Sequence, residues 1–221
     1  MCRYCGLNVD KCNAAAGICN RGFDRQEDRD AILDVHNHLR RKVALGEETK
    51  GVGGIPQPGA SNMYKLKWSN ELAEVAQRWA DQCTFPHDDV RNTSTYSWVA
   101  QNAWAWSSGY PRDGSRTNTQ PRIEQLYNEV KDWPAGSVES FAFPGKSTGE
   151  IRHYTQIVWA ETKEVGCGTI TVRAGGAWMY NWYLFCNYGP GGNVPGASVY
   201  DTNTTAPCPS GSVEEDGLCV W

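Results

Sequence analysis

Apolar residues recur every three to four positions in several stretches of the chain, which is the spacing of an amphipathic helix. The longest such stretch covers residues 24–46, and its apolar stripe contains one histidine: Ile32, Val35, His36, Leu39 and Val43. The pattern therefore predicts a helix that turns His36 inward. Asp24 and Glu27 stand at the spacing of a capping box, and Gly46 is placed to end the helix.

Three further stretches predict helices. One begins at Ser69, a residue type that caps helix N-termini, and presents a continuous face: Leu72, Val75, Ala76, Trp79, Ala80 and Cys83. Another covers residues 121–134, with one proline suited to its first turn and a second proline that ends it. Residues 153–162 predict a shorter fourth helix.

Strand patterns follow in the second half of the chain. Residues 100–108 predict a short strand, and two later strands, 166–172 and 178–189, flank the paired glycines of a hairpin turn. Cys167 and Cys186 lie nearly equidistant from that turn. The hairpin would therefore bring these two cysteines face to face at bridging distance.

This mixture of helices and strands predicts an α+β fold. With 221 residues the chain is long enough to bury a core of its own, and we expect one folded domain over residues 26–200. Residues 1–25 are expected to form an irregular arm tied by disulfides. Residues 201–221 are expected to form a short C-terminal extension, in which Cys208 and Cys219 could close a loop.

Charge and hydropathy exclude two kinds of partner. The formal net charge is −4, and the 21 lysines and arginines are scattered along the chain. A protein that binds nucleic acid or an anionic membrane surface gathers such residues into a patch, so neither partner is expected. No apolar run reaches the roughly 18–20 residues that cross a bilayer, so we expect no membrane span.

Nine cysteines predict a secreted, extracellular protein, because a reducing cytosol would leave most of them as thiols without a use. Four of them lie in the first nineteen positions: Cys2, Cys5, Cys12 and Cys19. The first two have half of a zinc-site spacing, but no second pair of that spacing follows, which favours disulfides. Two N-x-S/T sequons, at Asn92 and Asn203, predict N-glycosylation of an exported chain.

Any histidine-based site must use the four histidines of the chain: His36, His38, His87 and His153. His87 follows the second predicted helix, and His153 opens the fourth. A single histidine is most often a hydrogen-bonded core or surface group. Spacing alone does not distinguish that reading from a catalytic or metal-binding one.

Several longer motifs resemble a known family. The segments RHYTQIVWAET and YLFCNYGPGGNV resemble the two signature segments of the CAP superfamily, which comprises cysteine-rich secretory proteins, antigen five and pathogenesis-related plant proteins. The segments LDVHNHLRRKVALG, LKWSNELAEVAQRWADQC, AQNAWAWSS and NEVKDW are similar to intervening family segments, in the same order. The resemblance covers about residues 1–200 and is greatest to the arthropod venom allergens of stings and saliva.

This resemblance implies a three-layer α–β–α sandwich with a central cleft that holds two histidines and two acidic residues. Matched motif by motif, these positions fall on His87, Glu129, His153 and, for the second acid, Gln101. The glutamine removes one negative charge from the site. Arg152 is a second departure, because the family usually has glycine before the second histidine.

Two readings of the cleft remain open. His87 and His153, as neutral imidazoles, could bind zinc or another divalent ion weakly, with water completing the shell. Alternatively, the four cleft residues form a hydrogen-bond network that joins the helices to the sheet. No cofactor is required by either reading.

Hydrolysis is the less favoured alternative. His153 could serve as general base with Glu129 to orient it, and Ser107 or Ser108 could be the nucleophile of a protease. The sequence contains no G-x-S-x-G elbow. We therefore expect a protein that is not an enzyme.

The cysteine pattern resembles that of the allergens, which implies the pairs Cys2–Cys12, Cys19–Cys83 and Cys167–Cys186. The family partner of Cys5 falls at Val90, which makes Cys5 the candidate odd thiol and leaves monomer and Cys5-linked dimer as alternatives. A Cys208–Cys219 loop would be much shorter than the channel-blocking domain of snake-type relatives. Pairing of Cys5 with Cys208 or Cys219 remains a rival.

Binding is the function class that these features favour. Some relatives carry fatty acids, eicosanoids or sterols in apolar channels between helices, and this chain has ten tryptophans and ten tyrosines. A groove between the first and third helices could hold such a ligand, with these residues as walls: Leu39, Val43, Val130 and Trp133. Host proteins are the other expected partners.

Overall fold

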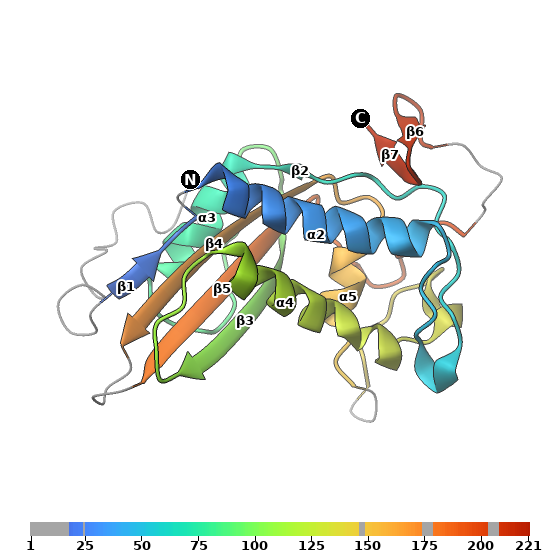
Figure 1. The fold of residues 1–221 in the computed structure, drawn as a ribbon. Helices are drawn as coiled ribbons and strands as arrows, with labels where there is room; N and C mark the ends of the chain where they lie inside the picture. Colours follow the sequence, from blue (N-terminus) through green and yellow to red (C-terminus); the bar gives the residue numbers. More distant parts are fainter. Residues whose placement is uncertain (1–17, 24, 146–148, 174–178, 203–207) are drawn as a thin grey trace.

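A central β-sheet lies between helices on both of its faces (Figure 1). The computed structural model describes residues 18–23, 25–145, 149–173, 179–202 and 208–221, except the side chains of Ile18 and Cys19. Within these ranges the predicted three-layer α–β–α sandwich is confirmed.

The sheet contains five strands in the spatial order β1-β4-β5-β3, with β2 paired parallel to β4. Their bounds are Ile18–Arg21 (β1), Lys67–Trp68 (β2), Ala100–Ser108 (β3), Glu164–Arg173 (β4) and Tyr180–Gly189 (β5). The last residues of the predicted N-terminal arm thus belong to the sheet. In the β4–β5 hairpin Cys167 stands opposite Cys186, and the predicted disulfide joins them at a Cα–Cα distance of 4.1 Å.

Three helices cover one face of the sheet and one helix covers the other. The first three are α2 (Gln26–Ala44), α4 (Arg116–Tyr127) and α5 (Arg152–Ile157), and the fourth is α3 (Asn70–Ala80). Short 3₁₀ helices add Val52–Gly54 (η1), Asn128–Asp132 (η2) and Ala135–Ser137 (η3). Side chains alternate accordingly along β5, where Leu184 faces the large core and Phe185 faces α3.

Two glycines let α3 approach the sheet closely. A Cβ atom on Gly166 would lie 2.3 Å from the backbone N of Ala73, and one on Gly168 would lie 2.3 Å from the backbone N of Gln77. Neither contact is sterically possible without moving backbone. The G-x-G of β4 therefore sets the spacing between these two layers.

The apolar stripe predicted for α2 is confirmed, since all five of its residues are buried. Gly46 has a φ of 70° and follows the helix, and the N–H groups of Gly46 and Glu47 bond to the carbonyls of Val43 and Lys42. This is the Schellman pattern of helix termination. Asp24 of the predicted capping box lies outside the described residues. The N-cap is Arg25, and Glu27 pairs with the Arg25 guanidinium at 2.7 Å.

His36 is a core residue. Its Nδ1 lies 2.7 Å from the carbonyl oxygen of Ile32 and therefore carries the hydrogen, while its Nε2 accepts from the Tyr188 hydroxyl at 2.9 Å. Burial lowers the pKa of His36 to about 4. This histidine is neutral at pH 7, and its role is structural.

Arg40, the next inward position of α2, is fully buried and donates only to backbone carbonyls. Its guanidinium reaches five of them at 2.6–3.2 Å: Tyr64, Ile157, Trp159, Ala160 and Thr162. Burial lowers its pKa to about 9, so the group remains charged at pH 7. Arg40 thereby ties α2 to the loop before β2 and to the segment that follows α5.

The third predicted helix begins earlier than its apolar pattern indicated. α4 starts at Arg116, so Pro121 lies inside the helix and not in its first turn. The residues before this proline are polar, and Thr119 is the buried one among them, so the apolar pattern gave no sign of them. The end of the predicted helix is the 3₁₀ helix η2, which carries Glu129.

The other two helices are shorter than predicted. α3 has the predicted cap, since the Ser69 hydroxyl accepts from the backbone N–H of Leu72, but it ends at Ala80. Cys83 follows it with a φ of 55° and is bonded in a disulfide. α5 covers only six residues.

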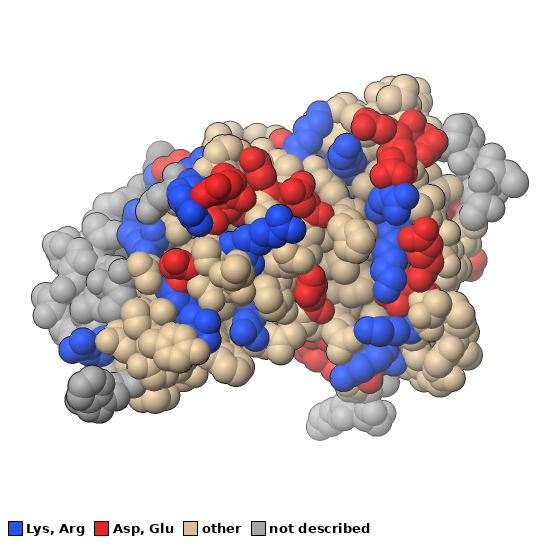
Figure 2. Space-filling model, in the orientation of Figure 1, with Lys and Arg blue, Asp and Glu red and all other residues tan. Residues whose placement is uncertain are grey.

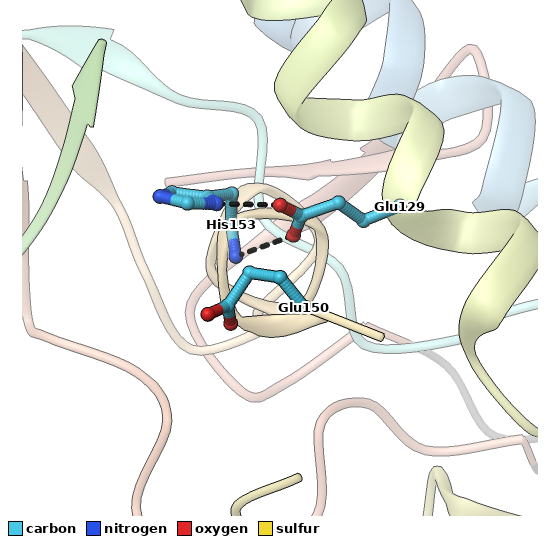
Figure 3. A group of neighbouring side chains, drawn as sticks. All are labelled: Glu129, Glu150 and His153. Atoms are coloured by element: carbon cyan, nitrogen blue, oxygen red, sulfur yellow. Dashed lines mark hydrogen bonds and ion pairs between the residues drawn. The ribbon is translucent and has the colours of Figure 1, made fainter. Parts of the chain in front are cut away.

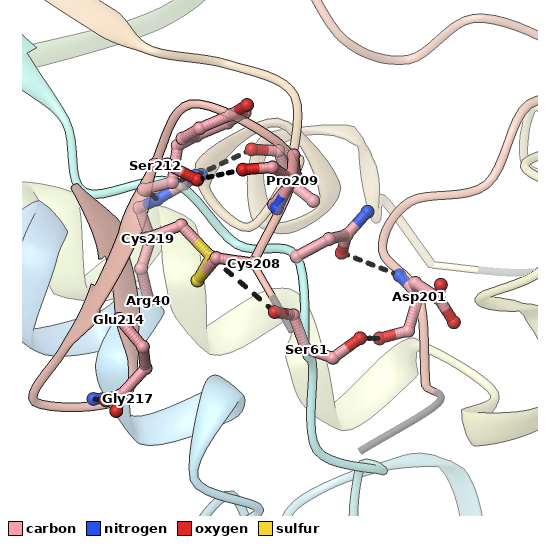
Figure 4. Close-up of a disulfide and its surroundings, with 12 residues drawn as sticks. Arg40, Ser61, Asp201, Cys208, Pro209, Ser212, Glu214, Gly217 and Cys219 are labelled. Carbon is pink, nitrogen blue, oxygen red and sulfur yellow. Dashed lines mark hydrogen bonds between the residues drawn. A yellow bond between two sulfur atoms is a disulfide. The ribbon is translucent and has the colours of Figure 1, made fainter. Parts of the chain in front are cut away.

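The C-terminal extension forms a hairpin of β6 (Val213–Glu215) and β7 (Leu218–Val220) that packs on the main body (Figure 4). Its disulfide joins Cys208 to Cys219, which rules out the rival pairing of either cysteine with Cys5. Backbone bonds connect Cys219 to Met63 and Lys65 at 2.9 Å each. The other predicted pairs and the thiol of Cys5 involve positions outside the described residues.

The charge pattern agrees with the expectation from the sequence. Figure 2 shows lysines and arginines interspersed with aspartates and glutamates over the face that carries α2 and α4. No single-sign patch forms on this face. Among the described helices, none is both long and apolar enough to cross a membrane.

Candidate functional site

A cavity of about 240 Å³ opens where β3, the loop after α3 and the start of α5 meet. Three of the four predicted cleft residues line it: His87, Gln101 and His153. The fourth, Glu129, lies directly behind His153 and bonds to it. The structure therefore brings the predicted set together from four separate segments of the chain.

His153 is fixed by Glu129 (Figure 3). The Nδ1–H of its imidazole donates to Oε1 of Glu129 at 2.6 Å, and its backbone N–H donates to Oε2 at 3.0 Å. Oε2 also accepts from the backbone N–H of Tyr154 at 3.3 Å. Because Ile151, the N-cap of α5, offers no side-chain cap, the Glu129 carboxylate serves as the cap of α5 as well as the partner of His153.

The tautomer of His153 follows from this pair. A carboxylate can only accept, so Nδ1 carries the hydrogen and the neutral ring has its lone pair on Nε2. Figure 3 shows this second ring nitrogen directed away from both Glu129 and Glu150. No hydrogen-bond partner for it exists in the described part of the chain.

Gln101 orients His87 in the same way as Glu129 orients His153. The Oε1 of Gln101 accepts from the backbone N–H of Asp88 at 3.3 Å and lies 3.0 Å from Nδ1 of His87, so this nitrogen also carries the hydrogen. Gln101 donates in turn to Oδ1 of Asn187, its neighbour across β3 and β5, at 2.9 Å. His87 thus also presents Nε2 as its remaining ring nitrogen.

Aromatic packing positions the loop that carries His87. Trp79 of α3 donates from Nε1 to the carbonyl of Pro86 at 2.8 Å, and Phe85 stacks on Tyr183 of β5 at a centroid distance of 6.0 Å. Partial burial of the His87 ring lowers its pKa, and the nearby charge of Arg91 lowers it further, against the opposing hydrogen bond to Gln101. His87 is therefore mostly neutral at pH 7.

The cleft is also joined to the core network. Asn102 of β3 donates from Nδ2 to the backbone carbonyl of His153 at 3.1 Å and to the hydroxyl of Tyr188 at 3.3 Å. Tyr188 in turn donates to His36. The network reading made from the sequence is thus correct for the floor of the cleft, while both Nε2 atoms remain available for a ligand.

Two arginines border the cleft, and only one of them has a carboxylate partner. Arg152 forms a two-bond pair with Glu150, with N–O distances of 2.7 and 2.6 Å, and this pair lowers the pKa of Glu150 to about 2. Arg91 donates from Nε to the carbonyl of Val99 at 3.1 Å and from Nη1 to the carbonyl of Asp88. Within the described residues no carboxylate lies at ion-pair distance from Arg91.

The donor set is compatible with a weakly bound divalent ion. Two imidazoles, each oriented through Nδ1–H by an acceptor behind it, match the usual support of a metal-binding histidine. Ligand atoms of Glu129, Glu150 and His153 also come within 4.8 Å of one another. These two carboxylates are already engaged by His153 and Arg152, so the imidazoles are the better ligands.

The proposed nucleophiles lie elsewhere. Ser107 and Ser108 stand six and seven residues beyond Gln101 along β3, which is about 20 Å at the rise of a β-strand. Ser107 donates to Oδ1 of Asn181, and Ser108 donates to the carbonyl of Tyr110 at 2.5 Å. The hypothesis that either serine reacts with the help of His153 is therefore wrong.

The residues expected to wall an apolar groove are core residues. Leu39, Val43, Val130 and Trp133 are between 0% and 7% exposed and belong to one continuous core, so they fill the space between the helices. Trp133 alone among them borders a separate cavity of about 160 Å³. That cavity has mostly apolar walls and shares Phe143 with the central cleft.

The lining residues that the predicted site did not include are led by three with large side chains: Arg91, Trp98 and Phe143. Arg91 follows His87 by four residues in the same loop, which could have drawn notice, whereas Phe143 comes from a distant loop. Of the two predicted glycosylation sites, Asn92 is exposed, as a sequon requires, and Asn203 lies outside the described residues.

Comparisons with known proteins find similar chains and a similar fold over most of the sequence. Residues 33–188 match the model of the cysteine-rich secretory protein family, CAP. Venom allergen 3 of Solenopsis invicta is 46% identical over 183 residues, which cover 82% of this chain and 75% of that protein. Venom allergen 5.02 of Vespa crabro is 40% identical over 208 residues, covering 91% and 92%. The crystal structure of NaASP2 with Zn²⁺ has a TM-score of 0.69 and 28% identity, covering 88% of this chain and 96% of that one.

Proposed function

Because the chain belongs to the cysteine-rich secretory protein (CAP) family, we propose that it is a secreted venom or salivary protein that binds a small ligand or a host protein and performs no hydrolysis. The observation that carries this proposal is the central cleft. It combines the open ring nitrogens of His87 and His153 with two exposed aromatic side chains, Trp98 and Phe143. Pockets for small molecules typically have such apolar walls and a few convergent polar groups.

The positions of the candidate nucleophiles in the described part of the chain support binding over acyl transfer. His153 and Glu129 have the geometry of a base and its orienting acid, but a base acts only on a proton within hydrogen-bond reach. The two serines considered for that role lie at the far end of β3. The described cysteines are in disulfides, so they offer no thiolate either.

Fatty acids, eicosanoids and sterols remain the apolar ligands of this proposal. The cavity beside Trp133 supports it, because its walls are largely apolar: Trp133, Pro134, Ala142, Phe143, Pro144 and Ile151. Phe143 lines both this cavity and the central cleft. A ligand with a polar head in the cleft and an apolar tail past Phe143 would use both.

Native mass spectrometry of the purified protein tests this function, with denaturing mass spectrometry after organic extraction as the matched measurement. We expect an added mass in the native spectrum that extraction removes and identifies. A bare mass in protein taken from its natural secretion would contradict small-ligand carriage and leave host-protein binding. A His153→Ala variant that keeps any hydrolytic activity of the preparation would assign that activity to a contaminant.

Weak binding of a divalent ion is the second candidate function. Its support is the pair of imidazoles whose Nδ1–H groups are held by Glu129 and Gln101, together with the Zn²⁺ named for NaASP2. Gln101 contributes no charge, and Arg91 and Arg152 oppose a cation. We therefore propose an affinity well below that of a structural zinc site.

Calorimetric titration with Zn²⁺ tests this second function. We expect weak binding at pH 7.5 that is lost in His153→Ala and retained in His38→Ala, which removes an exposed histidine of α2. Binding should also weaken at pH 5.5, since protonated imidazoles do not bind metal. Equal weakening by both substitutions would place the zinc elsewhere.

A further inference from the structure

The surface that a ligand meets in the central cleft is cationic. Two of its lining residues, Arg91 and Arg152, carry a positive charge. Among the described residues that line it there is no carboxylate, because Glu129 and Glu150 lie behind His153 and Arg152. A charge of one sign in a concave site raises the local concentration of ligands of the opposite sign.

Arg91 is the least compensated of these charges. It is half-buried, its Nε and Nη1 atoms donate to backbone carbonyls, and the nearby carboxylates of Asp88 and Asp89 lie beyond ion-pair distance. Burial accordingly lowers the pKa of Arg91. Partial burial of an unpaired guanidinium costs free energy, and a bound oxyanion would offset that cost.

The apolar part of the cleft is equally well defined. Trp98 is 52% exposed and Phe143 is 58% exposed, although both line the cavity. The indole N–H of Trp98 donates to the carbonyl of Gly192 at 3.3 Å, and a Cβ on Gly191 would lie 2.7 Å from its ring. The ring is thus fixed in place with an open surface, a site for a flat apolar group.

Gln101 and Arg152 leave their part of the cleft without negative charge. Gln101 lines the cavity as an uncharged amide, and Arg152 lines it with a guanidinium. Glu150 balances Arg152, but it does not line the cavity. The combination disfavours a cationic ligand and leaves the imidazoles without the carboxylate that would help to hold a metal ion.

We propose that the central cleft binds a small organic acid, whose oxyanion pairs with Arg91 and whose apolar or aromatic body lies against Trp98 and Phe143. The cavity of about 240 Å³ is below the roughly 300–1,000 Å³ of typical drug-sized sites, which favours a compact acid. This inference rests on the proposed binding function of the cleft and specifies the charge of its ligand.

The test compares three probes that share one body and differ in their head group: 3-phenylpropionate, 3-phenylpropan-1-ol and 3-phenylpropylamine. Each is titrated calorimetrically into the full-length protein at low salt. We expect the acid to bind at least ~10-fold more tightly than the alcohol and the amine, with an affinity that falls as salt is added.

Matched variants assign the charge. Arg91→Gln should weaken acid binding at least ~10-fold, and Arg91→Lys should retain part of it because the charge remains. Arg116→Gln removes the same charge from the far end of α4 and should change the affinity less than ~2-fold. Circular dichroism melting checks that each variant is folded.

The outcomes separate this inference from the proposed function. Tighter binding of the amine or of Zn²⁺ than of the acid would overturn the inference. The same holds if folded Arg91→Gln and Arg91→Lys both bind the acid as the parent does. In either case the cleft would still be a binding site. If neither the three probes nor Zn²⁺ produces a signal, the inference fails, and the small-ligand part of the proposed function fails with it, which leaves host-protein binding.

Discussion

Substitution of Arg40 by methionine tests how the helices of the large core are held together. Arg40 donates to five buried carbonyls. Two of these, on Trp159 and Ala160, also accept from the backbone N–H groups of Thr162 and Tyr64. The variant therefore removes the donor that Arg40 supplies to the other three, on Tyr64, Ile157 and Thr162.

The expected cost follows from those three acceptors. A buried polar group left without a partner costs roughly 1–3 kcal/mol, and removing one member of a buried charged network costs about 3–5 kcal/mol. Methionine keeps most of the apolar contact of the arginine stem, so cavity formation adds little. We expect Arg40→Met to lower the free energy of unfolding by about 3–5 kcal/mol, and Tm by roughly 10 °C.

Urea unfolding with the disulfides intact, followed by tryptophan fluorescence, measures this change. The matched control is Arg41→Met, because the neighbouring Arg41 pairs with Asp216 on the surface, with exposures of 35% and 70%. Its urea midpoint should stay close to that of the parent. Equal midpoints for the two variants would refute the role assigned to Arg40.

Three other predictions concern the core and the C-terminal hairpin. The pKa of His36 is lowered to about 4 in the folded protein, so the unfolded chain binds a proton at this histidine first as the pH falls. The free energy of unfolding of the parent, measured with urea, should therefore fall by about 2 kcal/mol between pH 7 and pH 5, and this loss should be missing in His36→Gln. An equal loss in both proteins would contradict this prediction. Gly166→Ala should lower the free energy of unfolding by about 2–3 kcal/mol, because its Cβ would meet the backbone of α3. Gly136→Ala, with open space around the Cβ, should lower it much less. Similar urea midpoints for the two variants would argue against the close approach of α3 to the sheet. Replacing Cys208 and Cys219 together by serine should lower the free energy of unfolding by about 3 kcal/mol, the chain-entropy value for a loop of this length, and an unchanged urea midpoint would show that the hairpin contributes nothing.

The parts of the fold that were predictable are those encoded locally. The stripe of α2, its glycine terminus and the Cys167–Cys186 bridge depend on spacing within one helix or one hairpin. The start of α4 was missed because polar residues before Pro121 carry no apolar period. The burial of Arg40 was not predicted, because its carbonyl partners lie at least 24 residues away along the chain.

In the cleft, too, the features that depend on distant residues were not predictable from local spacing. Its four polar residues come from four separate segments, and only the resemblance to a family indicated that they meet. Their hydrogen bonds depend on tertiary positions, as when Glu129 of η2 caps α5 and orients His153. The cationic lining was unpredictable for the same reason, since Arg91 reaches the cleft from a loop and Arg152 reaches it from α5, 61 residues away in sequence.

The most direct test of the account is an NMR titration of the histidine rings, because the chain has only four. With 3-phenylpropionate as the probe and His→Ala variants for assignment, the account predicts that the signals of His87 and His153 shift together, while those of the buried His36 remain unchanged. Saturating probe that leaves the His87 and His153 signals in place would show that the cleft is not where the protein binds its ligand.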